Sequence, residues 1–168
     1  MATTPIYALR YQALGDAPDG PDLGAELAAD VEAQLVLLNA KPIIDGAACT
    51  TQVDLTGTEV DITGATKTIV TTKTNARFIA IATFYMSAIT GGTGVATGKL
   101  NVDTVNQAPQ ANFTGTTTLD RANVTLVCSG TLAAVGNHVF KLRGIQTAGG
   151  AFRVNTTATN FVVAVFER

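Results

Sequence analysis

The sequence has few of the residues from which catalytic and metal sites are most often built. Its 168 residues include no tryptophan, two cysteines and one histidine, His138. A lone histidine suggests no histidine-based triad and excludes a multi-histidine metal site within one chain, so we expect His138 at the surface or in a turn. Cys49 and Cys128 stand far apart and outside any CxxC or Cys/His cluster, which predicts free, packed thiols. We therefore expect no enzymatic activity, no catalytic residue, no metal site and no cofactor.

Charge and long apolar runs are also scarce. Only 14% of the residues are charged, 46% are hydrophobic, and a net charge of -2 gives no electrostatic footprint for nucleic acid. No apolar run approaches the roughly 20 residues that span a bilayer, so we expect no membrane insertion. The N-terminus shows no secretory signal pattern, which favours synthesis and assembly in the cytoplasm. A surface this poor in charge indicates contacts with other subunits.

The sequence changes character near residue 50. Of its 27 threonines only Thr3 and Thr4 precede that position, and threonine together with Val, Ile and Phe is typical of strands. Short strands that recur about every ten residues, separated by turns such as TGGTG at 90–94, indicate a mainly β fold, an antiparallel jelly-roll sandwich. The expected strands are 53–56, 59–62, 67–72, 76–87, 96–103, 121–132, 138–146, 151–155 and 159–168.

Two of the expected strands are apolar on both faces. In 76–87 and 159–168 hydrophobic residues follow one another, whereas a strand with a solvated face alternates with polar residues. Either both are inner strands covered by loops, or a subunit interface covers their outer face, because no helix is expected after residue 40. The residues assigned to the trimer interface or the core are Phe78, Ile79, Ile81, Phe84, Tyr85, Phe161, Val162, Val163 and Phe166.

Three carboxylates, Asp54, Glu59 and Asp61, lie close together in the sequence. Such a group can serve as acid and base or bind calcium. Alternation places Glu59 and Asp61 on one face of a strand, opposite Val60 and Ile62. We therefore interpret them as a solvated strand edge.

Residues 22–40 are expected to form a short α-helix. Asp22 is a plausible N-cap, and Lys41-Pro42 ends the periodic pattern. Leu23 and the residues Leu27, Val31, Leu35 and Leu38 recur at helical spacing and form one apolar stripe. A helix of this length is marginal alone in water, so the stripe either associates with copies of itself or packs on its own or a neighbour's β domain.

Residues 1–21 are expected to form an extended docking arm. Pro5, Pro18 and Pro21 interrupt any regular structure, yet the segment is too rich in large apolar residues for a disordered tail. Either the arm docks on another protein, or its apolar groups fold back on the domain. The docking residues are Ile6, Tyr7, Leu9, Tyr11 and Leu14. The expected organisation is thus arm 1–21, helix 22–40, linker 41–52 and β head 53–168.

The N-terminal sequence resembles that of small virion proteins of phages that infect actinobacteria. In those proteins a Y-x-L-x-Y-P/Q…D-x-P-D-G ribbon leads into a short L-A-x-x-V-E-x-x-L helix. The segments KLNVDTVNQAPQANF, GNHVFKLRGIQTAGG and TNFVVAVFER resemble the trimeric jelly-roll heads of phage fibres and spikes, which are related to tumour necrosis factor and complement globular heads. The positions that match the first motif are Tyr7, Leu9, Tyr11, Gln12, Asp16, Pro18, Asp19, Gly20, Leu27, Ala28, Val31, Glu32 and Leu35.

The resemblance implies a homotrimeric structural protein located in the virion, as a minor tail or fibre protein or as a capsid decoration protein. Its partners would be its own copies and other virion proteins of the capsid or tail. The alternative is a module that binds a host-surface receptor or a carbohydrate. The lack of tryptophan, with most phenylalanines in strand patterns, leaves few aromatic rings for stacking on a sugar.

Overall fold

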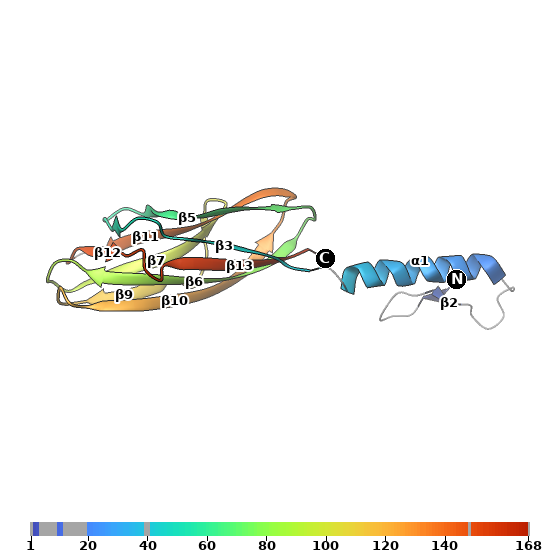
Figure 1. Ribbon diagram of the computed structural model, residues 1–168, viewed down its shortest axis with the longest axis horizontal. Coiled ribbons are helices and arrows are strands. Elements are labelled where there is room, and N and C mark those ends of the chain that lie inside the picture. The colour runs from blue at the N-terminus through green and yellow to red at the C-terminus, as the bar shows by residue number, and fades with distance from the viewer. Residues whose placement is uncertain (1, 4–9, 12–19, 39–40, 148, 168) are drawn as a thin grey trace. The chain divides into compact units, whose positions relative to one another are not determined.

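The computed structural model describes residues 2–3, 10–11, 20–38, 41–147 and 149–167 (Figure 1). The chain divides into two compact units, Met1–Lys41 together with Arg168, and Pro42–Glu167. Among the described residues, no helix is long and apolar enough to cross a membrane.

The first unit contains a helix and two short strands. Helix α1 spans Gly20–Leu38, and β1 (Ala2–Thr3) pairs antiparallel with β2 (Arg10–Tyr11), which lies against α1. Pro21 suits the first turn because its missing N–H has no intrahelical acceptor there. The helix begins before Asp22, so the prediction of an N-cap at Asp22 was wrong. The backbone of Asp22 instead belongs to the first turn of α1.

Most of the predicted docking arm lies outside the described residues. Ile6, Tyr7, Leu9 and Leu14 are not described, and Tyr11 is described only as part of the backbone of β2. The docking role of these five residues therefore stays a prediction.

The second unit is a sandwich of two antiparallel sheets (Figure 1). The six-stranded sheet contains β3 (Ile43–Ala48), β13 (Asn160–Phe166), β6 (Ala76–Ala88), β12 (Phe152–Val154), β4 (Val53–Asp54) and, paired with β6, β10 (Arg121–Leu132). The five-stranded sheet contains β5 (Val60–Thr71), β11 (Gly136–Thr147), β7 (Gly94–Val102), β8 (Val105–Asn106) and, paired with β7, β9 (Ala111–Gly115).

The strand order makes the sandwich a jelly roll, which confirms the predicted fold class. The long strands are arranged β3-β13-β6-β10 in one sheet and β5-β11-β7-β9 in the other. If these eight strands are numbered 1 to 8 in chain order, the two sheets have the strand orders 1-8-3-6 and 2-7-4-5. The chain therefore crosses repeatedly between the sheets. Every strand pair is antiparallel, as a jelly roll built from Greek keys requires.

Side chains that alternate along the long strands fill the space between the sheets. Every second residue of β6, from Ala76 to Ala88, is buried. Phe78 of β6 meets Phe140 of β11 edge to face, with ring centroids 5.3 Å apart and an interplanar angle of 83°. Burial of these large side chains provides most of the free energy that stabilises the sandwich.

The segment 41–52 was predicted to be a linker, and this prediction was wrong. Residues 43–48 form β3, which pairs with β13 along its length. The dipeptide Asp45-Gly46 is typical of a turn, but here it lies within the strand. A Cβ at Gly46 would come within 2.2 Å of the Phe161 carbonyl oxygen, so glycine permits close approach to β13. The Asp45 carboxylate reaches Lys67 of β5 at 2.8 Å, and hydrogen bonds from Lys67 and from the Gly46 N–H lower the pKa of Asp45.

The expected strands 59–62 and 67–72 are one strand, β5. Opposite the step from Lys141 to Arg143 in β11, the register of β5 jumps from Thr66 to Asp61. The extra residues form a bulge that contains Gly64, whose φ of 85° suits glycine. Thr63-Gly64 therefore bends the strand instead of ending it.

Candidate functional site

The outer face of the six-stranded sheet carries a contiguous group of exposed aliphatic residues, the apolar face. Its five members are between 48% and 66% exposed. Val127, Ile81 and Val162 form one cross-strand row over β10, β6 and β13, and Ile79 stands two residues from Ile81 on the same face of β6. Ala164 lies between Ile79 and Ile44 in the next row. The members are Ile44, Ile79, Ile81, Val127 and Val162.

The structure divides the residues predicted for the core or the trimer interface into two groups. The inward group is buried between the sheets and consists of Phe78, Phe84, Phe161 and Val163. The outward group includes Ile79, Ile81 and Val162, which belong to the apolar face. Tyr85 and Phe166 are half-buried. Strict alternation along β6 and β13 produces this division, so each strand contributes to the core and to the exposed face.

Water-exposed aliphatic side chains are common singly, but a contiguous group is a feature of interaction sites. Each member of the apolar face has an aliphatic neighbour across or along a strand, so the group is contiguous. At its margin the hydroxyls of Thr83 and Thr125 hydrogen bond to each other at 3.0 Å. These two hydroxyls are thus satisfied without a ligand, and the chemistry of the apolar face is that of a protein contact.

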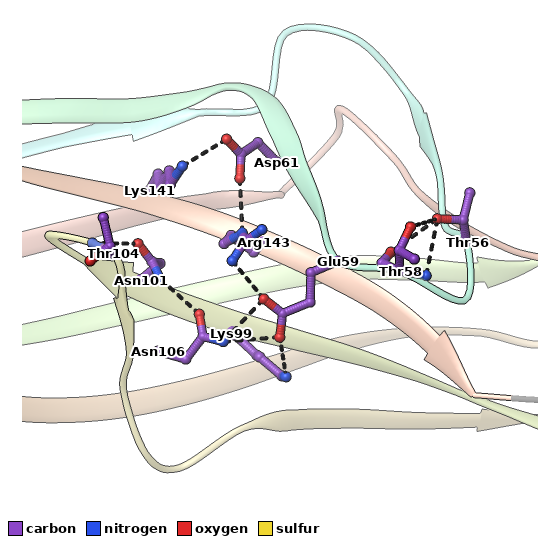
Figure 2. A network of polar contacts seen from close by, with 10 residues as sticks. All are labelled: Thr56, Thr58, Glu59, Asp61, Lys99, Asn101, Thr104, Asn106, Lys141 and Arg143. Atoms are coloured by element: carbon purple, nitrogen blue, oxygen red, sulfur yellow. Dashed lines mark hydrogen bonds and ion pairs between the residues drawn. The ribbon is translucent and has the colours of Figure 1, made fainter.

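The outer face of the five-stranded sheet has the opposite character, with a network of charged side chains (Figure 2). Glu59 accepts a hydrogen bond from Lys99 and forms an ion pair with Arg143 at 2.6 Å. Arg143 also contacts Asp61 at 2.9 Å, and Asp61 contacts Lys141 at 2.8 Å. The hydrogen bond from Lys99 lowers the pKa of Glu59, and the one from Lys141 lowers the pKa of Asp61.

The interpretation of Glu59 and Asp61 as a strand edge agrees with the position of β5 in its sheet. Strand β5 is an edge strand, and Ile62 points into the core. Asp61 is half-exposed, whereas Glu59 is largely covered by its cationic partners and by Asn106, which donates to it at 2.9 Å. The solvated interpretation thus fits Asp61 and does not fit Glu59, which is covered by its partners.

His138 is buried, so the prediction of a surface or turn histidine was wrong. Its ring nitrogen Nδ1 lies 2.5 Å from Oδ2 of Asp103, and Nε2 lies 3.0 Å from the carbonyl oxygen of Ala134. Both partners are acceptors, so only the doubly protonated imidazolium can donate to both. Burial lowers the pKa of His138, but the hydrogen bonds to Asp103 and Ala134 outweigh it and raise the pKa overall.

This geometry predicts a pH-dependent contribution of His138 to stability. Because the folded pKa lies above the ordinary value of about 6.5, the contribution is fully present below that value and is lost as pH rises through the folded pKa. We expect the melting temperature of the native chain to exceed that of His138→Gln by more at pH 5.5 than at pH 8.5. Calorimetry at both pH values measures the difference, and a gap that does not change with pH would contradict the assignment.

Both cysteines are buried free thiols. Burial raises the pKa of Cys128 to about 11, and burial also raises the pKa of Cys49, whose Sγ donates to the Thr51 carbonyl at 3.0 Å. Because the thiolate is the reactive form, we expect no labelling of the native protein by a thiol reagent at pH 8 and labelling of both cysteines in denaturant. Rapid labelling of native Cys128, or a crosslink between the two cysteines, would show the core to be more open.

Comparison with known proteins gives likeness of fold. No family model matches the chain, and it matches no curated protein. Eiger TNF from S. frugiperda is 10% identical with a TM-score of 0.49, over 76% of this chain and 94% of that one. The tripod from the baseplate of bacteriophage Tuc2009 is 10% identical with a TM-score of 0.46, over 100% and 79%. An infectious bursal disease virus protein (Gt strain) is 9% identical with a TM-score of 0.42, over 76% and 38%. With identities of 9–10% and TM-scores below 0.5, these similarities support no argument about function. The class of the β unit, an antiparallel jelly roll, follows from its strand order.

Proposed function

We propose that the protein is a non-enzymatic structural component of a phage virion, a homotrimer held together through the apolar face and anchored to the particle by its N-terminal arm. The observation that carries this proposal is the set of exposed aliphatic residues in register over β3, β13, β6 and β10. Exposure of an apolar surface to water is unfavourable. Covering it with a second apolar surface lowers the free energy by about 25 cal/mol per Å² of apolar area buried.

The contrast between the two sheets supports a homotypic contact on one side only. The five-stranded sheet presents the ion pairs of Glu59 and Asp61, whose desolvation would oppose close packing. The apolar face carries no such cost. Assembly through the apolar face would leave the charged network on the outside of the assembly.

The helix supplies a second surface for association. Leu27, Val31 and Leu35 are between 39% and 50% exposed, whereas Glu26 and Asp30 are half-buried. These three members of the apolar stripe are therefore left exposed. We propose that it packs against the same helix of neighbouring subunits, with Leu38 extending the stripe; packing on a β domain is the alternative.

The number of subunits and the location in a virion rest on the sequence resemblance described above. A minor tail or fibre protein and a capsid decoration protein both fit an arm, a helix and a jelly-roll head. Electron microscopy of intact particles labelled with an antibody against residues 42–167 tests the proposal. Label at fixed sites on the tail or the capsid is the expected result, and purified particles without label would contradict it.

A second candidate, a module that recognises sugars by aromatic stacking, finds no support in the head. Six of the seven phenylalanines are buried, and Phe166 is half-buried. Tyr85 is the one tyrosine of the β unit and is also half-buried. Within the described part of the head, no group of exposed aromatic rings gathers at the loop tips. Recognition of a sugar would have to use charge and hydrogen bonds.

A further inference from the structure

A polar pocket lies on the outer face of the six-stranded sheet, toward the C-terminal end of β6. Its floor is formed by Tyr85 and Ser87 of β6. Arg121 of β10 stands opposite Ser87 on one side, and Arg153 of β12 stands opposite Ser87 on the other. Asn155, which follows β12, also lines the pocket. Two guanidinium groups thus flank one serine in a single cross-strand row.

The wall on the β12 side is held in place by hydrogen bonds. Asp54 binds Arg153 through two bonds, from Nε at 2.5 Å and from Nη2 at 3.1 Å. The bond from Arg153 lowers the pKa of Asp54, so this carboxylate stays charged at neutral pH. Asn155 donates to the Ser87 hydroxyl at 3.1 Å and accepts from Gln52 at 3.3 Å. The wall is therefore ordered before any ligand arrives.

The wall on the β10 side is a turn fixed by Asp120. Its carboxylate accepts hydrogen bonds from the backbone N–H of Thr116 at 2.6 Å and of Thr117 at 2.9 Å. These bonds lower the pKa of Asp120 to about 2. The turn places Thr118 at the rim of the pocket, next to Arg121. Asp120 is engaged by its own turn and is not the counter-ion of the neighbouring arginine.

The polar groups of the pocket that are not used in these hydrogen bonds are mainly donors. Throughout the described ranges, the Arg121 guanidinium forms no hydrogen bond and no ion pair. Arg153 Nη1 reaches only a 3.4 Å contact with Gln52, and the Ser87 hydroxyl accepts from Asn155 and retains its own proton for donation. Asp54 pairs with Arg153, and Asp120 accepts from its own turn, so Arg121 is the guanidinium of the pocket lining that has no anionic partner among the described residues. Its complement is an anionic, acceptor-rich group.

We propose that this pocket binds an acidic saccharide, with the carboxylate of the sugar on Arg121 and its hydroxyls on Ser87 and Arg153. Arginine forms paired, charge-assisted hydrogen bonds with a carboxylate. The two arginines stand on strands either side of β6, about 10 Å apart at the backbone, a span that accommodates one sugar ring and its carboxylate. Recognition through donors also suits a head without exposed aromatic rings. The inference goes beyond the structural role proposed above and does not depend on it.

Titration calorimetry of the full chain with glucuronate tests the inference, with glucose as the neutral sugar of the same ring and inorganic phosphate as a free oxyanion. We expect glucuronate to bind at least about tenfold more tightly than either, because glucose lacks the charge and phosphate lacks the ring. Arg121→Gln should weaken glucuronate binding about tenfold or more. Arg77→Gln, which removes the same charge from the other end of the outer face of β6, should leave it unchanged.

Several results would overturn the inference. Equal affinity for phosphate and glucuronate would indicate a simple oxyanion site, and equal weakening by both arginine variants would indicate unspecific attraction. A change in subunit mass on Arg121→Gln would make the arginine a contact between copies. If Arg121→Gln does not fold, Ser87→Ala must reduce glucuronate binding instead, and unchanged binding in that variant contradicts the site. The subunit mass is measured separately. Binding of glucuronate by a protein of one chain mass would support this inference and contradict the proposed trimer, and a trimer that does not bind glucuronate would do the reverse.

Discussion

Phe161→Asp is expected to unfold the β-sandwich, whereas Val162→Asp, one position along the same strand, is expected to leave it folded and to separate the subunits. Phe161 is fully buried between the sheets, and Val162 is half-exposed on the apolar face. Truncation of a buried phenylalanine to alanine costs about 3–5 kcal/mol, and an aspartate adds an unpaired buried charge to that loss. The total approaches the roughly 5–15 kcal/mol by which a domain is stable.

Circular dichroism and light scattering distinguish the two outcomes. Phe161→Asp should lose the cooperative melting transition, and Val162→Asp should retain it while its mass falls to that of one chain, 17.3 kDa. Val162→Thr, nearly equal in volume and uncharged, serves as the control and should remain assembled. A Val162→Asp variant that keeps the mass of the native protein would place the subunit contact elsewhere.

Deletion of residues 2–19 is expected to abolish incorporation of the protein into virions while the head and its assembly remain intact. The deletion stops at residue 19 because α1 begins at Gly20. Aliphatic and tyrosine side chains of the arm lose apolar surface on docking, and three arms per trimer act together through their effective concentration. Because every subunit carries the same deletion, all three arms are lost together and the trimer has no anchor.

The measurement is the amount of the protein in purified particles from cells that produce only the truncated form, with circular dichroism and mass of the isolated protein as controls. Occupancy should fall to background. Normal occupancy would show that the head or the helix provides the anchor. Loss of folding in the isolated protein would show that the arm belongs to the structure of the domain.

The long strands were predictable because their residues alternate. Strand β10 was predicted with its observed bounds, 121–132, and β6 was predicted one residue short of Ala88. In β13 and β6 the apolar residues on both faces predicted an outer face covered by loops or by a subunit interface. The structure leaves Ile81 and Val162 half-exposed on that face, so no loop among the described residues covers them. A period of two residues identifies faces, but it does not say which face points inward.

The remaining elements depend on contacts between residues distant in sequence. The local sequence around Gly46 is typical of a turn. Its place within a strand is explained by the close approach of β13, which is distant in sequence. The partner of His138, Asp103, lies in the turn after β7. Asp103 has a φ of 49°, which no sequence pattern predicted. The two arginines of the pocket come from β10 and β12, which meet only across β6. Such pairs are set by topology, which is known only once the strand order is known.

The central claim is that the apolar face joins copies of the chain, and the mass of the unmodified protein in solution tests it most directly. Size-exclusion chromatography with multi-angle light scattering, at micromolar concentration and physiological salt, measures that mass without a variant. The expected result is a single species of three chains, each of 17.3 kDa, that persists in high salt because the contact is hydrophobic. A monodisperse species of one chain mass over this concentration range would contradict the account.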